Sequence, residues 1–116
     1  MIIMDKTEGN GRFALGTSVI DFFGKVNGLP GGEGVQMGIA VLPAGMSTDF
    51  SAHTGDEYSF VVSGSLTCHT HNETHIIPTG AGIFTPAGEM HRSTNDADVD
   101  CVCVWFEVDT GIKTQE

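Results

Sequence analysis

The chain has 116 residues, the usual size of one domain, and its 40% hydrophobic content suffices for a single core but not for two. Its 15 acidic and 5 basic side chains give a formal charge of −10, which repels phosphate backbones and anionic lipid heads, so we expect no nucleic-acid or membrane partner. No apolar run approaches the roughly 20 residues of a membrane helix, and the first residues are too short and wrongly flanked for a signal peptide.

In chain order, residues 1–10 are predicted to be a loose polar tail. The segment Phe13–Phe23 is apolar without a clean period and predicts a strand or an irregular segment. A helical turn opened by Thr17 and Ser18 is the alternative. Residues 24–34 contain five glycines and a proline, which predicts a loop.

Short strands separated by turn residues fill the rest of the chain. The expected strands are 35–42, 48–53, 57–62, 66–71, 75–77, 83–85, 91–94 and 101–108. An acidic loop is expected at 95–100, between the last two of these strands, and Asn95 is expected to fix a turn there. Residues 109–116 are expected to be a second loose tail. The whole chain, 1–116, therefore predicts one all-β sandwich or barrel.

The three cysteines, Cys68, Cys101 and Cys103, are odd in number and lack the spacing of a disulfide framework. We therefore expect a reducing, cytoplasmic setting. Cys101 and Cys103 share a strand face with Trp105. A thiolate pair that binds metal is one alternative, but packing as small hydrophobic side chains is favoured.

Side chains in a strand alternate between faces, so Asp49, Ser51 and His53 are expected to point the same way. Glu57 begins the next strand after a Gly-Asp turn, and a hairpin of this kind can bring it back beside His53. His91 follows the rigid turn Pro86-Ala87-Gly88, which aims its strand at a fixed place.

Two imidazoles and one carboxylate leave coordination positions open for water or substrate. We therefore predict one divalent metal ion on His53, Glu57 and His91. The set favours Fe(II), and Mn, Ni and Zn are the alternatives.

The spacing of residues 45–95 resembles the two-part signature of the cupin superfamily. The second part has Gly80, Pro86-Ala87-Gly88, His91 and Asn95 at the family's intervals, and the first part has Gly45, Ser51-Ala52-His53, Glu57 and Gly64. The resemblance implies a double-stranded β-helix, the jelly-roll barrel, with the metal inside. The resemblance also implies that His53, Glu57 and His91 are the metal ligands.

One position departs from the family's pattern, because Ser51 stands where histidine is usual. Three interpretations remain open. The site is a three-ligand metal centre, or Ser51 holds a water that completes the shell, or the barrel is metal-free and binds an organic ligand.

The resemblance implies either a metal-dependent enzyme, an oxygenase or a Lewis-acid lyase or isomerase, acting on a small oxygenated molecule, or a non-enzymatic binding or sensing protein. Sugar epimerases of the same fold work without metal. Catalytic residues are unknown, with Ser51, Asp49 and Tyr58 as candidates near the site. Tyr58 could line a pocket or fill the core, and core packing is favoured for Phe60.

Two further expectations concern the surface. His69, His71 and His75 could form a second metal site, although solvated side chains on a hairpin are favoured. Free strand edges and the apolar stretch Phe13–Phe23 lead us to expect a homodimer.

Overall fold

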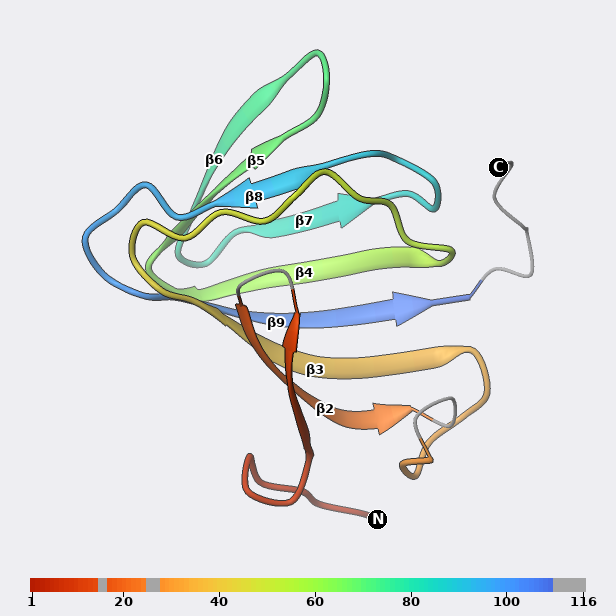
Figure 1. Cartoon of the computed structure of the whole chain (residues 1–116). Coiled ribbons are helices and arrows are strands. Elements are labelled where there is room, and N and C mark those ends of the chain that lie inside the picture. The colour runs from red at the N-terminus through yellow and green to blue at the C-terminus, as the bar shows by residue number, and fades with distance from the viewer. Residues whose placement is uncertain (15–16, 25–27, 110–116) are drawn as a thin grey trace.

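The structure is a computed structural model and describes residues 1–14, 17–24 and 28–109. Within these ranges the chain forms strands and no helix (Figure 1), so no described helix could cross a membrane. The strands are β1 (Asn10–Ala14), β2 (Thr17–Gly24), β3 (Val35–Leu42), β4 (Asp56–Ser63), β5 (Ser65–His69), β6 (Thr74–Pro78), β7 (Gly82–Thr85), β8 (Arg92–Thr94) and β9 (Cys101–Val108).

The strands form two antiparallel sheets, which confirms the predicted all-β jelly-roll fold. The larger sheet has the order β1-β2-β3-β9-β4-β7, and the smaller one has the order β6-β5-β8. The last strand, β9, lies between β3 and β4 near the centre of the larger sheet (Figure 1). Its alternating cysteine, valine and aromatic residues suit a strand with a neighbour on each side.

The N-terminal segment is more regular than the sequence predicts. Strands β1 and β2 form an antiparallel hairpin, and β2 continues into the sheet by pairing with β3. The alternative of a helical turn at Thr17 is therefore wrong, because the backbone of β2 is engaged along β3. The predicted tail at 1–10 is too long by one residue, since Asn10 belongs to β1. The C-terminal tail from residue 110 lies outside the described residues.

The predicted strand at 48–53 is wrong as a regular element. This segment forms two isolated bridges instead of a continuous ladder, Ser47 with Thr94 in β8 and Ser51 with His91 just before β8. Between them the Thr48 hydroxyl accepts a hydrogen bond from the Ser93 amide at 2.9 Å, in the place of a backbone carbonyl. The segment still lies along β8 and extends the smaller sheet.

A small apolar core lies between the two sheets. Its buried members are Leu42, Val61, Leu66, Cys101 and Cys103. The Sγ atoms of Cys101 and Cys103 are 3.7 Å apart, and burial raises the pKa of both thiols. The favoured interpretation of these cysteines as packed hydrophobic side chains is therefore confirmed.

Asn95 is completely buried and organises the acidic loop after β8. Its amide donates hydrogen bonds to the carbonyl oxygens of Leu42 and Val99, at 2.9 and 2.8 Å. Its Oδ1 accepts one from the Ala97 amide at 3.1 Å. The predicted turn role of Asn95 is confirmed, and its side chain ties the loop to the end of β3.

Candidate metal centre

A cavity of about 310 Å³ lies between the two sheets, with lining residues from both of them. Much of its wall is apolar and includes Val19, Leu42, Leu66, Ile83 and Trp105. The polar lining residues include the three predicted metal ligands.

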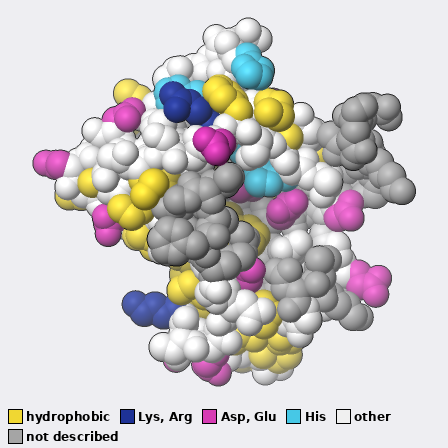
Figure 2. All heavy atoms as spheres, viewed as in Figure 1, with side chains coloured by type: hydrophobic (Ala, Val, Ile, Leu, Met, Phe, Trp, Pro, Cys, Tyr) yellow, Lys and Arg dark blue, Asp and Glu magenta, His cyan; other side chains and the backbone are white. Residues whose placement is uncertain are grey.

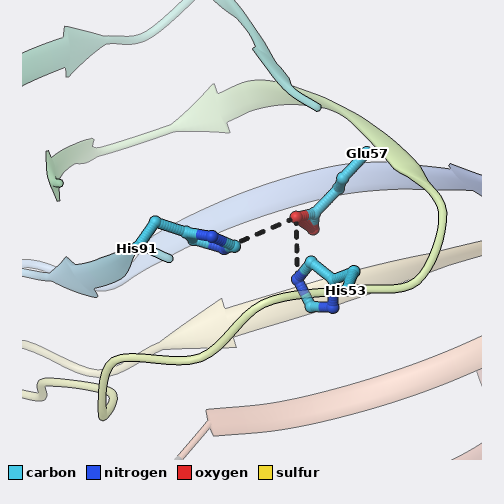
Figure 3. Close-up of side chains that lie close together, drawn as sticks. All are labelled: His53, Glu57 and His91. Carbon is cyan, nitrogen blue, oxygen red and sulfur yellow. Dashed lines mark ion pairs between the residues drawn. The ribbon is translucent and has the colours of Figure 1, made fainter. Parts of the chain in front are cut away.

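The three predicted ligands converge on one point. Figure 3 shows the Glu57 carboxylate pointing between the imidazoles of His53 and His91. Glu57 Oε2 lies 3.1 Å from His53 Nε2 and 3.8 Å from His91 Nε2. One ligand atom from each residue lies within 4.8 Å of the others. Ligand atoms held about 2.1 Å from one metal ion are roughly 3.0–3.4 Å apart, so small side-chain rotations suffice to bind an ion.

The turn before His91 is attached to the segment that carries the other two candidate ligands, His53 and Glu57. The Gly88 amide donates a hydrogen bond to the His53 carbonyl at 2.9 Å, and the Ala87 amide donates one to Asp56 Oδ1 at 2.9 Å. Gly88 has a φ of 82°, a left-handed conformation that favours glycine. The Pro86-Ala87-Gly88 turn thus connects both halves of the site.

His91 is held in one orientation and one tautomer. Its backbone amide and carbonyl exchange hydrogen bonds with those of Ser51, both at 2.9 Å. Its Nδ1 lies 2.9 Å from the Glu89 carbonyl oxygen, and a carbonyl can only accept, so Nδ1 carries the proton. The lone pair of Nε2 is therefore directed towards Glu57, as a metal ligand requires.

The three candidate ligands line the cavity and are partly accessible to solvent. The side chain of His53 is 34% exposed, whereas those of Glu57 and His91 are 20% and 17% exposed. Three protein ligands with this partial exposure would leave coordination positions of a bound ion open for substrate or water.

A second carboxylate, Glu107, faces the same cavity, and the sequence reasoning missed it. Glu107 lies directly opposite Glu57 in the pairing of β9 with β4. The signal was available, because Glu107 shares its strand face with Cys101, Cys103 and Trp105 by simple alternation. Like charges directly opposite one another are unfavourable, so this pair gains from a nearby cation.

The three catalytic candidates occupy different places. Ser51 lines the cavity. Asp49 is exposed, so the expectation that it faces inward is wrong, because an irregular segment does not keep strict alternation. Tyr58 is 48% exposed and its ring packs against Phe84 with centroids 5.0 Å apart. Phe60 is also exposed, at 46%, and the prediction that it packs in the core is wrong, since the inward positions of β4 are Glu57, Ser59 and Val61.

The other histidines have separate surroundings. Both ring nitrogens of His69 lie within hydrogen-bonding distance of threonine hydroxyls. His71 stacks on Phe50, and His75 lies beside Glu73. Within residues 1–14, 17–24 and 28–109, the only group able to hold a metal ion is His53, Glu57 and His91.

A model of the cupin domain matches residues 38–107, which is more than half of the chain. The protein belongs to the cupin family, as the spacing of its motif led us to expect. No curated protein matches the chain in sequence.

Solved structures share the fold at low sequence identity. A Cupin 2 conserved barrel domain protein from Salinispora arenicola has a TM-score of 0.78 and 16% identity, over 96% of this chain and 91% of that one. The polyketide cyclase RemF from Streptomyces resistomycificus has a TM-score of 0.78 and 16% identity, over 93% and 79%. A predicted oxalate decarboxylase from Thermotoga maritima has a TM-score of 0.75 and 17% identity, over 92% and 98%.

Proposed function

We propose that the protein binds one divalent metal ion through His53, Glu57 and His91, and that it is an enzyme acting on a small oxygenated molecule in the cavity. The observation that carries this proposal is the convergence of the three ligand atoms within 4.8 Å. The fixed tautomer of His91 supports it, because the hydrogen bond to Glu89 leaves Nε2 free to coordinate.

The donor set favours Fe(II), because two histidines and one carboxylate leave several positions open. Iron would supply dioxygen activation, whereas Mn, Ni or Zn would supply Lewis acidity. The charges of the cavity also favour a cation. Its lining contains Glu57 and Glu107, and no Lys or Arg from the described residues. Acidic side chains also predominate over Lys and Arg on the face shown in Figure 2.

The cavity supports a substrate with an apolar body and an oxygen-bearing end. A volume of about 310 Å³ is at the lower end for ligand pockets. Trp105, Leu66 and Ile83 would pack against the body, while the polar end would lie at the metal ligands. The similar structures include a polyketide cyclase and a predicted oxalate decarboxylase, so the fold is compatible with more than one reaction.

Glu107 is the residue we assign to proton transfer. No hydrogen bond or ion pair joins its carboxylate to another residue of the described ranges, so its oxygens are available to a bound molecule. It stands beside Glu57 across the strand pair, within reach of a substrate that contacts the ligands.

Metal analysis of protein purified without a histidine tag tests the binding site. We expect near-stoichiometric metal in the wild type and its loss in both Glu57→Ala and His91→Ala. His75→Ala is the matched control, since His75 is exposed and lies beside Glu73, and it should keep the metal. Full metal content in both ligand variants would end the assignment.

A second candidate function is binding or sensing without turnover. The observation that favours it is Ser51, which replaces the family's usual fourth ligand. Oxygen uptake with Fe(II) and a panel of small acids, thiols and phenols separates the two. An enzyme should show turnover that Glu107→Gln abolishes without loss of metal. A sensor should turn nothing over, yet gain melting temperature with one compound.

A further inference from the structure

The indole N–H of Trp105 is a hydrogen-bond donor that the protein itself does not use. The side chain lines the cavity and is only 8% exposed. No described residue accepts a hydrogen bond from its Nε1, although every fully buried side-chain nitrogen and oxygen of those residues has a partner. Nε1 is therefore not fully buried, and the space that it borders is the cavity. A buried tryptophan usually finds a partner for this group, so the donor is available to a molecule in the cavity.

The position of the indole follows from a glycine on the neighbouring strand. Trp105 lies in β9 and pairs with Gly38 of β3 on one side and with Ser59 of β4 on the other. A Cβ added at Gly38 would lie 2.6 Å from Cζ2 and 2.8 Å from Cε2 of the indole. The ring therefore lies across β3 in the space that glycine leaves open. Because Cε2 is bonded to Nε1, the donor lies on the side of β9 away from β4.

This donor is well separated from the candidate metal ligands. Glu57 lies on β4, two strands away from β3 and two residues along from the row that holds Gly38 and Trp105. With strands about 4.8 Å apart and a rise of about 3.4 Å per residue, the backbone positions of Glu57 and Gly38 are roughly 12 Å apart. One molecule can contact both ends, since Glu57 and Trp105 line the same cavity.

The chemistry of the cavity indicates which group Trp105 would bind. An indole N–H only donates, so the bound group has to accept. A carboxylate would be unfavourable there, because the lining contains Glu57 and Glu107 and no Lys or Arg from the described residues, and a buried charge without a partner is costly. A neutral oxygen, such as a ketone or lactone carbonyl, can accept the hydrogen bond without that cost.

We propose that Trp105 Nε1 binds a second, neutral oxygen of the substrate, which is therefore an elongated molecule with an oxygen at each end of an apolar body. This inference rests on the proposed metal centre, which would hold the first oxygen. A metal–oxygen bond of about 2.1 Å and a hydrogen bond of about 2.9 Å leave roughly 7 Å between the two oxygens. One para-substituted aromatic ring spans this separation.

A matched pair of small molecules tests the proposal by calorimetric titration of the zinc-loaded protein. The ketone para-hydroxyacetophenone has an oxygen at each end of one ring, and para-ethylphenol lacks the ketone oxygen. Trp105→Phe keeps an aromatic ring but removes the donor, so it should lower the affinity ratio of ketone to ethyl compound about 10-fold. An unchanged ratio would overturn the proposal.

Ser93→Ala is the matched control for this titration. Ser93 lines the cavity from β8 in the smaller sheet, and its hydroxyl lies 3.9 Å from Cys68 Sγ. Its removal deletes a polar group from the opposite wall and should leave the affinity ratio as in the wild type. A fall equal to that of Trp105→Phe would mean that the ratio does not report on the indole, which would also overturn the proposal.

Nuclear magnetic resonance gives an independent measurement on the wild type, which serves if Trp105→Phe fails to fold. Trp105 is the single tryptophan, so its indole N–H gives one signal of its own. In the free protein this proton should exchange readily with water from the cavity. The ketone should shift the signal downfield and slow the exchange, whereas the ethyl compound should not. A proton already protected in the free protein, or one that does not respond to millimolar ketone, would overturn the proposal.

The same measurement separates this inference from the proposed metal centre. If the wild type binds no metal and the ketone still shifts the Trp105 signal, the metal centre is wrong and the role of Trp105 stands. If zinc binds and is lost in His91→Ala, but the ketone leaves the Trp105 signal unchanged, the metal centre stands and the role of Trp105 is wrong.

Discussion

Replacing Gly55 with alanine would disturb the link between two of the proposed metal ligands, His53 and Glu57. Gly55 lies between His53 and Glu57, is buried, and runs against the end of β9. An alanine Cβ at this position would lie 2.6 Å from the Val108 carbonyl oxygen and 2.9 Å from its carbonyl carbon. The obstacle is backbone in a paired strand, so it cannot rotate away as a side chain would.

The size of the effect follows from these distances. Carbon–oxygen contacts in proteins are about 3.3 Å or longer, so β4 and β9 must separate by roughly 0.7 Å at this point. Overpacking of this kind costs about 2 kcal/mol, which lowers Tm by about 8 °C for a domain of this size. Because the shift falls two residues before Glu57, we also expect a loss of metal affinity of about 10-fold or more.

Thermal unfolding and a metal competition titration measure the two effects. Gly32→Ala is the control, since no heavy atom lies within 4 Å of the added Cβ and its φ is not positive. If Gly55→Ala matches Gly32→Ala in both stability and metal affinity, the close approach of β9 does not position the ligands and the reasoning is wrong.

Three further predictions concern single side chains. Asn95→Asp should lower the free energy of unfolding by about 3 kcal/mol in urea titrations, because a carboxylate would face two carbonyl oxygens that now accept from the amide; an unchanged midpoint would contradict this. Ser51→His should restore the family's fourth ligand at the cavity wall and raise metal affinity about 10-fold or more in competition titrations, and equal or weaker binding would argue against a metal in this position. Burial raises the pKa of Cys68 and Cys103 above the ordinary value of 9.0, so the folded state holds protons that the unfolded chain releases. Stability from these thiols is therefore complete below pH 9 and falls as the pH rises above it, and Cys103→Ser should flatten that fall in unfolding titrations between pH 8 and about pH 10.5.

Features that depend on neighbouring residues could be predicted from the sequence, whereas features that depend on contacts between distant residues could not. Turn residues and alternation located most strands to within a few residues, including those at 35–42 and 101–108. The predicted strand at 48–53 is wrong, because its extended composition does not reveal that it pairs with its neighbour through isolated bridges and not through a continuous ladder. The error carried over to Asp49, whose predicted direction depended on regular alternation.

The sequence by itself determined the fold class, the three residues that converge as candidate metal ligands and the turn that precedes His91, because each is encoded in residue types at short or characteristic spacings. Only the tertiary structure decided that β9 lies beside β4, which places Glu107 opposite Glu57 and sets Phe106 next to Tyr58 on the outer face. The physical reason is that strand order and register arise from contacts between residues far apart in the chain. Alternation shows which residues share a face of one strand, but not which strand will be its neighbour.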